Sequence, residues 1–447
     1  MSNEIGKGRS PVHVVYGGAH LFKPDTPKKL GGIALKTLET YATNFVEFAL
    51  AMGLAGSERL PSYPQAIVDL EKKLDKSAAK VKESDPAAWF AWTVYQRTIK
   101  KLKNEPVEDF RIDFEDGYGF RSDEEEDGHA VAASTALAKT FADGTITKFC
   151  GFRIKSLAPE TSVRGIRTLE LFLDNFLLKT VGKIPDNFVV TLPKVTDRKE
   201  IKKLVDRLST IEKKAKIKSA TIGIEIMVET PRAIFDEKGR LALPAFIKAA
   251  KGRCRSAHFG AYDYTALLGI SAIHQRIDHP ACDFARQVMQ VSLAPLSIRL
   301  SDSVTTEIPV AVHSDGSLTK IQREENRRAI HHAWRTHYNN VIRSMTNGFY
   351  QSWDLHPNQL VGRYAAVFAF FLESLDAQAA RLRGFIEKAT QASMNGNTFD
   401  DAASAQGLLN FFRMGIDCGA IAQQEAKDST GLTADDIRSP FQEIFKR

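Results

Sequence analysis

The amino-acid sequence predicts a (β/α)8 barrel, an α/β TIM-barrel fold in which eight parallel strands alternate with helices around a closed sheet. Short runs rich in Val, Ile and Phe alternate with longer helical stretches, the runs number eight, and several end in a polar or charged residue. The predicted strands are Val12–Tyr16, Phe110–Phe114, Phe149–Ile154, Phe188–Leu192, Ile222–Val228, Ser256–Ala261, Val304–Val310 and Phe349–Leu355. Leu296–Leu300 competes for the seventh place.

Two of the predicted crossover helices are amphipathic. Val163–Leu178 carries apolar residues at helical spacing on one side. Lys199–Ile217 combines an apolar face with a lysine-rich face, whose stems can cover apolar surface while the ammonium groups stay in water.

Two stretches exceed a plain barrel. Leu30–Val107 is too long for one crossover and predicts two or three helices, broken around Pro61–Pro64 and Asp85–Pro86. The tail predicts two helices, Arg363–Lys388 and Ala402–Gln424, separated by the polar segment SMNGNTFDD. We therefore predict a catalytic barrel over residues 1–362, with a helical insertion at about 30–107, and a C-terminal helical extension over 363–447.

Composition and charge exclude several classes of protein. The hydrophobic fraction of 43% and the charged fraction of 26% are ordinary for a globular protein, and no apolar run is long enough to span a membrane. The net charge of +7 is spread along the chain without a nucleic-acid-binding motif, so we expect neither nucleic acid nor membrane as a partner. Four scattered cysteines without a CxxC pair fit a reducing cytoplasm.

Charged side chains follow the predicted strands where a (β/α)8 barrel places its active site, at the carboxyl ends. They are Asp113, Glu115 and Asp116 after the second strand, Arg153 after the third, Lys194 after the fourth, Glu229 after the fifth, His258 and Asp263 at the sixth, and Asp354 and His356 at the eighth. We expect these charged clusters to lie together at the carboxyl end of the barrel, which we call its mouth.

The residue types indicate a metal-assisted reaction of a small acid. Glu229 and Asp263 can share Mg²⁺, which takes one or two protein carboxylates and completes its shell with water and substrate oxygens. A 2-oxo acid could chelate this metal, which would then stabilise an enolate as a C–C bond breaks or forms. Arg153 offers a planar fork for a carboxylate. The carboxylates of residues 113–116 could orient water or move a proton.

Each residue also has a purely structural interpretation. Asp263 could cap a helix, and Glu229 could precede a helix start at Pro231. Arg153 could form an ion pair with Asp113 or Asp116. Lys194 could be a surface residue, and His356 could lie in a turn. Their joint placement at successive strand ends is what favours a site.

Several motifs resemble the citrate lyase β-subunit, malyl-CoA lyase and hydroxy-keto-acid aldolase superfamily, which belongs to the phosphoenolpyruvate/pyruvate-binding barrels. The motifs, which occur in that family's order, are DFEDG (113–117), GFRIK (151–155), LPK (192–194), IMVETP (226–231), HFGAYDYTALLG (258–269) and WDLHPNQL (353–360). Departures occur at the first strand, where the chain has YGGAHLFKP instead of LFVPG, and in the long insertion and tail. GGAHLF together with WDLHPNQLVGRY resembles an aldolase/citrate-lyase-like branch.

The resemblance implies a barrel that handles 2-oxo-acid or acyl-CoA substrates with Mg²⁺, or with Mn²⁺ in its place. By motif match, Glu229 and Asp263 would bind the metal, and Arg153 would anchor the substrate carboxylate. Asp113, Glu115 and Asp116 would lie beside the metal and its waters. The resemblance also implies a homo-oligomer in which C-terminal helices reach a neighbouring subunit.

Three more residues complete the candidate site. Lys194 and His356 are candidate substrate contacts, and His20, at the end of the first strand, is a candidate proton-transfer group. We therefore expect a Mg²⁺-dependent carbon–carbon lyase or aldolase that acts on a small anionic 2-oxo acid or 3-hydroxy acid, with acyl-CoA as a further candidate substrate. Two alternatives stay open: a phosphoryl-transfer enzyme on the same barrel, for which no Walker-type loop is present, and a non-catalytic ligand-binding scaffold.

Overall fold

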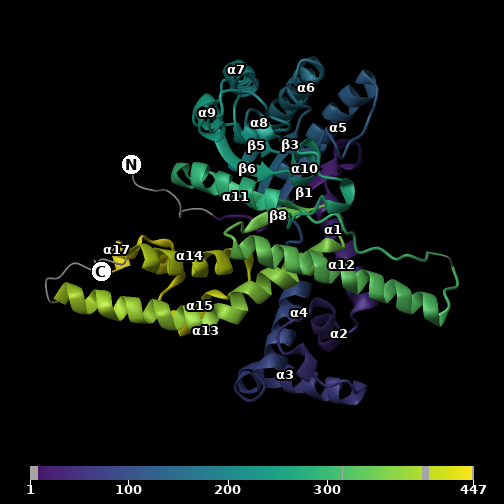
Figure 1. Cartoon of the computed structure of the whole chain (residues 1–447), viewed down its shortest axis with the longest axis vertical. Coiled ribbons are helices and arrows are strands. Elements are labelled where there is room, and N and C mark those ends of the chain that lie inside the picture. The colour runs from purple at the N-terminus through teal and green to yellow at the C-terminus, as the bar shows by residue number, and fades with distance from the viewer. Residues whose placement is uncertain (1–8, 315, 395–401, 445–447) are drawn as a thin grey trace.

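The computed structural model of the chain describes residues 9–314, 316–394 and 402–444, and its strands form a closed parallel barrel in sequence order from β1 to β8 (Figure 1). The strands are β1 His13–Gly18, β2 Asp109–Asp113, β3 Phe149–Arg153, β4 Phe188–Leu192, β5 Gly223–Val228, β6 Cys254–Phe259, β7 Arg299–Val304 and β8 Gln351–Asp354. The barrel closes through pairs such as His13 with Ser352. The predicted (β/α)8 fold is confirmed.

The seventh strand is the one whose predicted position is wrong. We predicted Val304–Val310, whereas β7 occupies Arg299–Val304 and so includes the end of the competing segment Leu296–Leu300. After Val304 the chain leaves the sheet, and the carbonyls of Thr305 and Glu307 accept hydrogen bonds from the Gln359 side chain. The buried part of β7 is largely polar, with the sequence Ser-Asp-Ser, so a search for apolar runs misses it.

The interior of the barrel is more polar than the branched aliphatic packing usual for this fold. The carboxylate of Glu225 accepts hydrogen bonds from Arg111 at 2.8 and 3.0 Å, from Thr191 at 2.7 Å, from Ser256 at 2.5 Å and from Tyr16 at 3.0 Å. Although burial opposes its charge, the Arg111 guanidinium holds the pKa of Glu225 well below its ordinary value. This network supports the floor of the mouth from below.

Helices and short 3-10 turns connect the strands on the outside of the barrel. Capping boxes start three of these helices, with Ser122 and Glu125 at α5, Asp197 and Glu200 at α7, and Thr319 and Gln322 at α12. The connections are η1 Ala19–Leu21, α5 Asp123–Ala142, α6 Ser162–Thr180, α7 Arg198–Lys214, α8 Pro231–Ile234, α9 Leu243–Ala249, α10 Ala261–Leu267, η3 Ala272–His274, α11 Pro280–Leu293, η4 Ala294–Leu296 and α12 Lys320–Thr346.

The insertion after β1 contains more helices than predicted. They are α1 Thr26–Tyr41, α2 Phe45–Met52, η2 Ser57–Arg59, α3 Pro64–Ser84 and α4 Pro86–Asn104. Helices do start at the prolines of the two predicted breaks, because proline fits the first turn. The additional break comes from Asn44, whose side chain accepts hydrogen bonds from the backbone N–H groups of Val46 and Glu47 and so starts α2.

The C-terminal part begins inside the predicted barrel segment. Helix α13 runs over Gln359–Met394, so the predicted division between residues 362 and 363 falls within a helix. Most of the predicted separator SMNGNTFDD lies outside the described residues. The remaining helices are α14 Ala402–Cys418, α15 Gln423–Thr430, α16 Ala434–Arg438 and α17 Phe441–Ile444.

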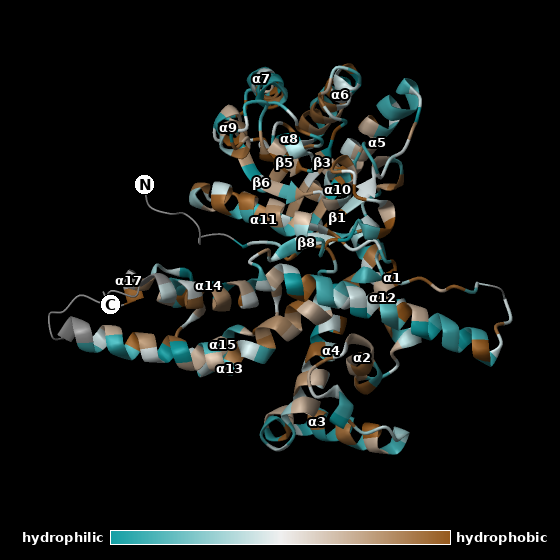
Figure 2. Ribbon diagram, in the orientation of Figure 1, coloured by the Kyte–Doolittle hydropathy of each residue, from teal (hydrophilic) through white to brown (hydrophobic). Residues whose placement is uncertain are grey.

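The long helices form a layer between the barrel and the insertion. Figure 1 shows α12 and α13 crossing one side of the barrel, with α2, α3 and α4 beyond them. Figure 2 shows that α13 is more apolar in this crossing region than toward its far end. Among the described residues, no helix combines the length and hydropathy that crossing a bilayer requires.

Candidate active site at the carboxyl ends of the strands

Arg153 and Asp113 form a buried ion pair across neighbouring strands. The register of β2 and β3 places the two residues opposite each other, and Asp113 accepts hydrogen bonds from Arg153 Nε at 2.6 Å and Nη2 at 2.5 Å. Asp113 also accepts from the backbone N–H groups of Glu115 and Gly117. Burial opposes the charge of Arg153, but Asp113 holds the pKa of the guanidinium well above its ordinary value. Arg153 therefore does form the ion pair with Asp113 that its structural interpretation predicted.

This pairing leaves one edge of the guanidinium available. A guanidinium carries five N–H groups, and Asp113 uses one side of the fork. Nη1 faces the loop after β2, with Glu115 Oε2 at 3.0 Å and Asp116 Oδ2 at 3.6 Å. Arg153 can therefore keep Asp113 and still present a second edge toward the mouth.

Glu115, Asp116 and Lys194 extend the same network. The Lys194 ammonium contacts the carboxylate of Glu115 and lies 2.8 Å from Asp116 Oδ1. Burial, reinforced by Asp116, raises the pKa of Glu115 to about 6, although Arg153 opposes the shift. The two acidic neighbours raise the pKa of Lys194 in spite of its partial burial. Lys194 also has a φ of 51°, which is the left-handed region that a non-glycine residue seldom occupies.

Glu229 and Asp263 lie together beside Lys194. Glu229 Oε1 accepts a hydrogen bond from the backbone N–H of Lys194 at 2.6 Å, and the carboxyl groups of Glu229 and Asp263 are hydrogen-bonded to each other. Burial, reinforced by Asp263, raises the pKa of Glu229 to about 8, and burial also raises the pKa of Asp263. Gly260 lies against Glu229: a Cβ on it would be 2.6 Å from Glu229 Oε2.

Neither acid serves as the helix cap considered as an alternative. Helix α10 has Gly260 at its N-cap position and no side-chain cap, and Asp263 is the third residue of its first turn. Helix α8 does start at Pro231, but the capping side chain is Thr230. Both carboxylates are therefore free of a capping role.

His20 and His356 lie apart from this network. The ring of His20 lies 5.6 Å from that of Tyr118 and 6.1 Å from that of His129, and burial and Arg121 lower its pKa. His356 Nδ1 accepts a hydrogen bond from the backbone N–H of Asn358, as expected for a turn residue, and burial lowers its pKa. Within the described residues, no hydrogen bond or ion pair connects either ring to the acidic cluster, so their proposed roles stay predictions.

Two neighbours of Arg153 were not expected from the sequence. Its Cζ lies 5.0 Å from the ring centre of Tyr16 and 6.0 Å from that of Trp353, and the two rings are stacked with centres 4.3 Å apart. Both residues occupy strands that the sequence located, so the alternation of inward and outward side chains was the signal that could have found them. Asp354, which follows Trp353, points outward to Arg363 and two histidines instead of into the mouth.

The residues present fit a hard divalent cation. Glu229 and Asp263 supply oxygen donors only, and burial, reinforced at Glu229 by Asp263, makes their ionised forms unfavourable in the absence of a cation. The described residues contain no group of three or more His, Cys, Asp or Glu arranged as a complete metal cage. Two carboxylates with further positions left to water and substrate are the arrangement that Mg²⁺ prefers.

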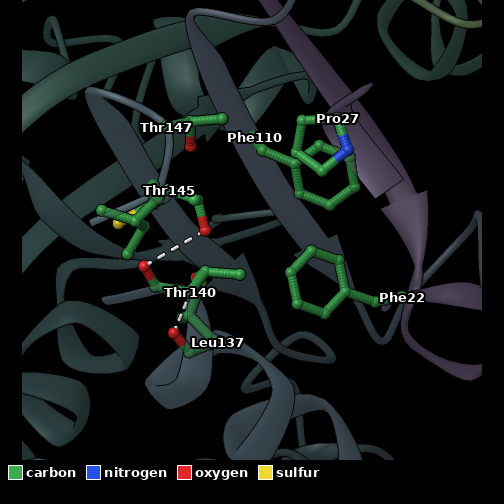
Figure 3. A pocket seen from close by; sticks show the side chains of 9 residues that line it. Phe22, Pro27, Phe110, Leu137, Thr140, Thr145 and Thr147 are labelled. Atoms are coloured by element: carbon green, nitrogen blue, oxygen red, sulfur yellow. Dashed lines mark hydrogen bonds between the residues drawn. The ribbon is translucent and has the colours of Figure 1, made fainter. Parts of the chain in front are cut away.

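Two cavities of the molecule lie away from these residues. One, of about 10 Å³, lies between α1, β2 and α5 and is lined mainly by Phe22, Phe110 and Leu137 (Figure 3). That volume is close to the minimum for one water molecule, so it is a packing gap. The second, of about 260 Å³, is a polar groove between α11 and the end of α12, lined by Arg286 and Arg343 among others. Neither is formed by the mouth residues.

Fold and site together define a (β/α)8 barrel with a charged, metal-compatible cluster at its carboxyl end. The family described as "Domain of unknown function (DUF6986)" matches residues 5–443, and the chain belongs to this family. No curated protein matches the chain.

Solved structures confirm the resemblance at the level of the fold. A citrate lyase from Burkholderia xenovorans is 19% identical, with 75% of this chain and 91% of that chain covered and a TM-score of 0.52. A malate synthase from Haloferax volcanii, in a pyruvate/acetyl-CoA ternary complex, is 15% identical, with coverages of 61% and 64% and a TM-score of 0.43. RipC from Yersinia pestis is 17% identical, with coverages of 59% and 90% and a TM-score of 0.38.

Proposed function

We propose that the protein is a Mg²⁺-dependent carbon–carbon lyase or aldolase that acts on a small 2-oxo acid or 3-hydroxy acid. The observation that carries the proposal is one continuous network, in which Arg153 and Lys194 lie within ion-pair distance of the acidic loop, and Lys194 also contacts Glu229. The network joins the ends of four strands and combines an anion-binding edge with a pair of metal-compatible carboxylates. These are the two parts that cleavage next to a carboxylate requires.

Arg153 would hold the substrate carboxylate. Its side-on pairing with Asp113 fixes the plane of the guanidinium, and the remaining edge is directed toward Glu115 and Asp116. A substrate carboxylate would approach the open edge of the guanidinium at Nη1, next to the Glu115 carboxylate. The fixed plane favours bidentate contact and so limits the orientations of the bound acid.

Glu229 and Asp263 would hold the metal ion. When bound, Mg²⁺ would supply Lewis-acid stabilisation of the negative charge that develops on the substrate oxygen. The backbone N–H of Lys194 orients Glu229 Oε1, and Gly260 leaves room for the carboxylate.

Glu115 is the best placed of the three loop carboxylates to move a proton. Both oxygens of Asp113 already accept hydrogen bonds from Arg153 and the backbone, and the side chain of Asp116 is half exposed. Glu115 is largely buried, adjoins the edge proposed for the substrate, and is held by two cations. A group in that position can exchange a proton with the carbon next to the carboxylate.

The first test separates binding from chemistry. Thermal unfolding is measured with Mg²⁺, with oxalate or pyruvate, and with both, and we expect the pair to stabilise the wild type more than either alone. Glu229→Gln is expected to remove the joint effect. The matched control is Glu160→Gln, at an exposed residue.

The outcomes distinguish the proposal from its rivals. A metal-dependent shift followed by turnover of 3-hydroxy acids or their acyl-CoA esters supports the lyase. Binding with turnover only when a nucleotide or another phosphoryl donor is supplied would replace it with phosphoryl transfer. No shift at millimolar Mg²⁺ and oxalate, or full retention of the joint effect in Glu229→Gln, contradicts the metal assignment.

We further propose acyl-CoA as a substrate class to test, Mn²⁺ as a substitute metal, and a homo-oligomer in a cytoplasmic setting. The four cysteines are free and buried, which supports a reducing compartment. Helices α14 to α17 pack along α13 and beside one another, away from the barrel, and this supports their use as a contact to a second copy. Light scattering of the full chain would test the assembly.

A further inference from the structure

Arg153 rests on an aromatic pair, Tyr16 and Trp353, whose contact with it no motif of the sequence indicated. The ring of Tyr16 lies below the guanidinium at 5.0 Å, and Trp353 stacks on Tyr16 with an angle of 22° between the planes. A guanidinium within about 6 Å of an aromatic ring centre is attracted by the ring's quadrupole, and the attraction strengthens when water is excluded. Arg153 is 3% exposed and Trp353 9% exposed, so this contact is largely shielded from solvent.

Tyr16 is itself fixed from inside the barrel. Its hydroxyl lies 3.0 Å from Glu225 Oε1 and 3.0 Å from His258 Nδ1, and Glu225 is in turn held by Arg111. These contacts come from strands β2, β5 and β6, none of which is paired with β8. The ring of Tyr16 therefore has little freedom to tilt, because Trp353 stacks on its face and the polar network adds a second restraint at its hydroxyl.

Trp353 supplies the second layer. Its indole Nε1 is buried and has no hydrogen-bond partner among the described residues. A buried unpaired N–H is unfavourable, so a plain apolar residue would suit a purely structural position better. The feature that distinguishes the indole at this position is its face, which stacks on Tyr16 and lies 6.0 Å from Arg153.

We propose that Tyr16 and Trp353 are positioning residues, which hold the Arg153 guanidinium in the plane that receives the substrate carboxylate. This inference rests on the proposed function for the identity of the ligand, but the contact itself belongs to the protein alone. Asp113 fixes one edge of the guanidinium, and the aromatic pair fixes its face. Because one edge and the face of the Arg153 guanidinium are both held, its open edge has a single orientation toward the mouth.

The ligand test compares two substitutions at Tyr16. Oxalate is titrated calorimetrically into the full chain loaded with Mn²⁺, and binding of Mn²⁺ alone is measured by electron paramagnetic resonance. We expect Tyr16→Leu to weaken oxalate about tenfold while changing Mn²⁺ binding less than twofold. Tyr16→Phe keeps the ring and is expected to retain most of the oxalate affinity. Unchanged oxalate affinity in Tyr16→Leu, or equal losses of oxalate and Mn²⁺ binding, would overturn the proposal.

A second measurement needs no ligand, so the inference stays testable if the wild type binds no oxalate and the proposed function fails. In ¹⁵N–¹H spectra of the arginine side chains, the Nε–H of Arg153 should be shifted by the Tyr16 ring and protected from exchange. Arg153→Lys, which deletes the signal, assigns it. We expect Tyr16→Leu to move the resonance and accelerate its exchange, and Tyr16→Phe to leave it nearly in place. A resonance that does not respond to Tyr16→Leu rules out the positioning role, and a Tyr16→Leu variant that does not fold transfers the same comparison to Trp353→Phe and Trp353→Leu.

Discussion

Asp354 and Glu229 are both buried carboxylates near strand ends of one barrel, yet their surroundings shift their pKa values in opposite directions. Asp354 accepts hydrogen bonds from His13 at 2.7 Å, from His337 at 2.8 Å and from Arg363 at 2.9 Å. Burial opposes its charge, but Arg363 and the histidines hold its pKa well below the ordinary value. Glu229 faces another acid, and its pKa rises to about 8.

The difference shows which part of the molecule is complete without a ligand. Around Asp354 the chain supplies every counter-charge, so the cluster joins β8 to β1, α12 and α13 as part of the fold. Around Glu229 the chain leaves negative charge uncompensated, which costs stability and favours the binding of a cation. Such unfavourable arrangements of titratable groups are typical of functional sites.

The largest expected effect is at Asp354. Asp354→Asn should lower the free energy of unfolding by about 3–5 kcal/mol, because it leaves the buried Arg363 without its carboxylate. Urea denaturation measures the loss, with the exposed Asp186→Asn as the matched control. A loss below about 1 kcal/mol would break the comparison, since Asp354 would then not be the centre of a stabilising cluster.

The pH dependence of the free energy of unfolding, compared between the wild type and Asp354→Asn, is a second test of the role of Asp354. The folded pKa of Asp354 is depressed, so its contribution is complete above the unfolded value of about 4 and is lost as the pH falls through the lower folded value. We therefore expect the stability gap between wild type and Asp354→Asn to be constant from about pH 5 to 8 and to narrow only below about pH 4. Denaturation series at several pH values test this, and a gap that shrinks toward pH 8 would contradict it.

A smaller effect is expected where a Cβ would intrude on the mouth. In Gly260→Ala the new methyl group would meet Glu229 Cβ at 2.5 Å and Oε2 at 2.6 Å, so the carboxylate must move. We expect a loss of about 1–3 kcal/mol and a weaker stabilisation by Mg²⁺. Gly32→Ala is the control, because Gly32 lies in α1 with open space around its Cβ position, and this substitution should be neutral or stabilising. If Gly260→Ala binds Mg²⁺ with the affinity of the wild type, then the position of the Glu229 carboxylate does not affect metal binding.

Removing the charge of Glu229 should raise the free energy of unfolding, whereas the two preceding substitutions should lower it. Glu229→Gln keeps the acceptor for the Lys194 backbone N–H but removes one of two facing carboxylates. In the presence of EDTA we expect the variant to be more stable than the wild type by about 0.5–2 kcal/mol, as is common when an active-site residue is replaced. Thermal unfolding with and without EDTA measures this. If the variant is less stable than the wild type in EDTA, Glu229 stabilises the fold, as Asp354 does, and is a structural acid.

The sequence predicted the barrel well, because seven of the eight predicted segments overlap most of the observed strands. It failed at β7, whose buried residues Ser301, Asp302 and Ser303 are satisfied by hydrogen bonds that no local pattern reveals. It also placed Asp354 near the mouth, since strand-end position does not determine whether a side chain points inward or outward.

The candidate site was predicted unevenly for a similar reason. The ordered motifs indicated Arg153, Lys194, Glu229 and Asp263, and the structure brings these four together with the acidic loop. Tyr16 and Trp353 could not be found that way, because their role depends on stacking between the first and last strands, which meet only when the barrel closes. A motif search cannot detect contacts that form only when strands far apart in the sequence pair to close the barrel.

The last expected effect concerns the strained backbone at Lys194. Its φ of 51° costs roughly 1–2 kcal/mol for a side chain with a Cβ, so Lys194→Gly should be more stable than Lys194→Ala by about that amount. Both variants lose the ammonium that contacts Glu115 and Asp116, so their difference in urea denaturation isolates the backbone. Lys216, exposed and with a φ of 55°, provides the matched pair Lys216→Gly and Lys216→Ala. We expect the same difference in stability at both positions but loss of the joint effect of Mg²⁺ and oxalate only at Lys194. If the Lys216 variants lose it too, or the Lys194 variants keep it, the Lys194 ammonium has no specific role in binding Mg²⁺ and oxalate at the mouth.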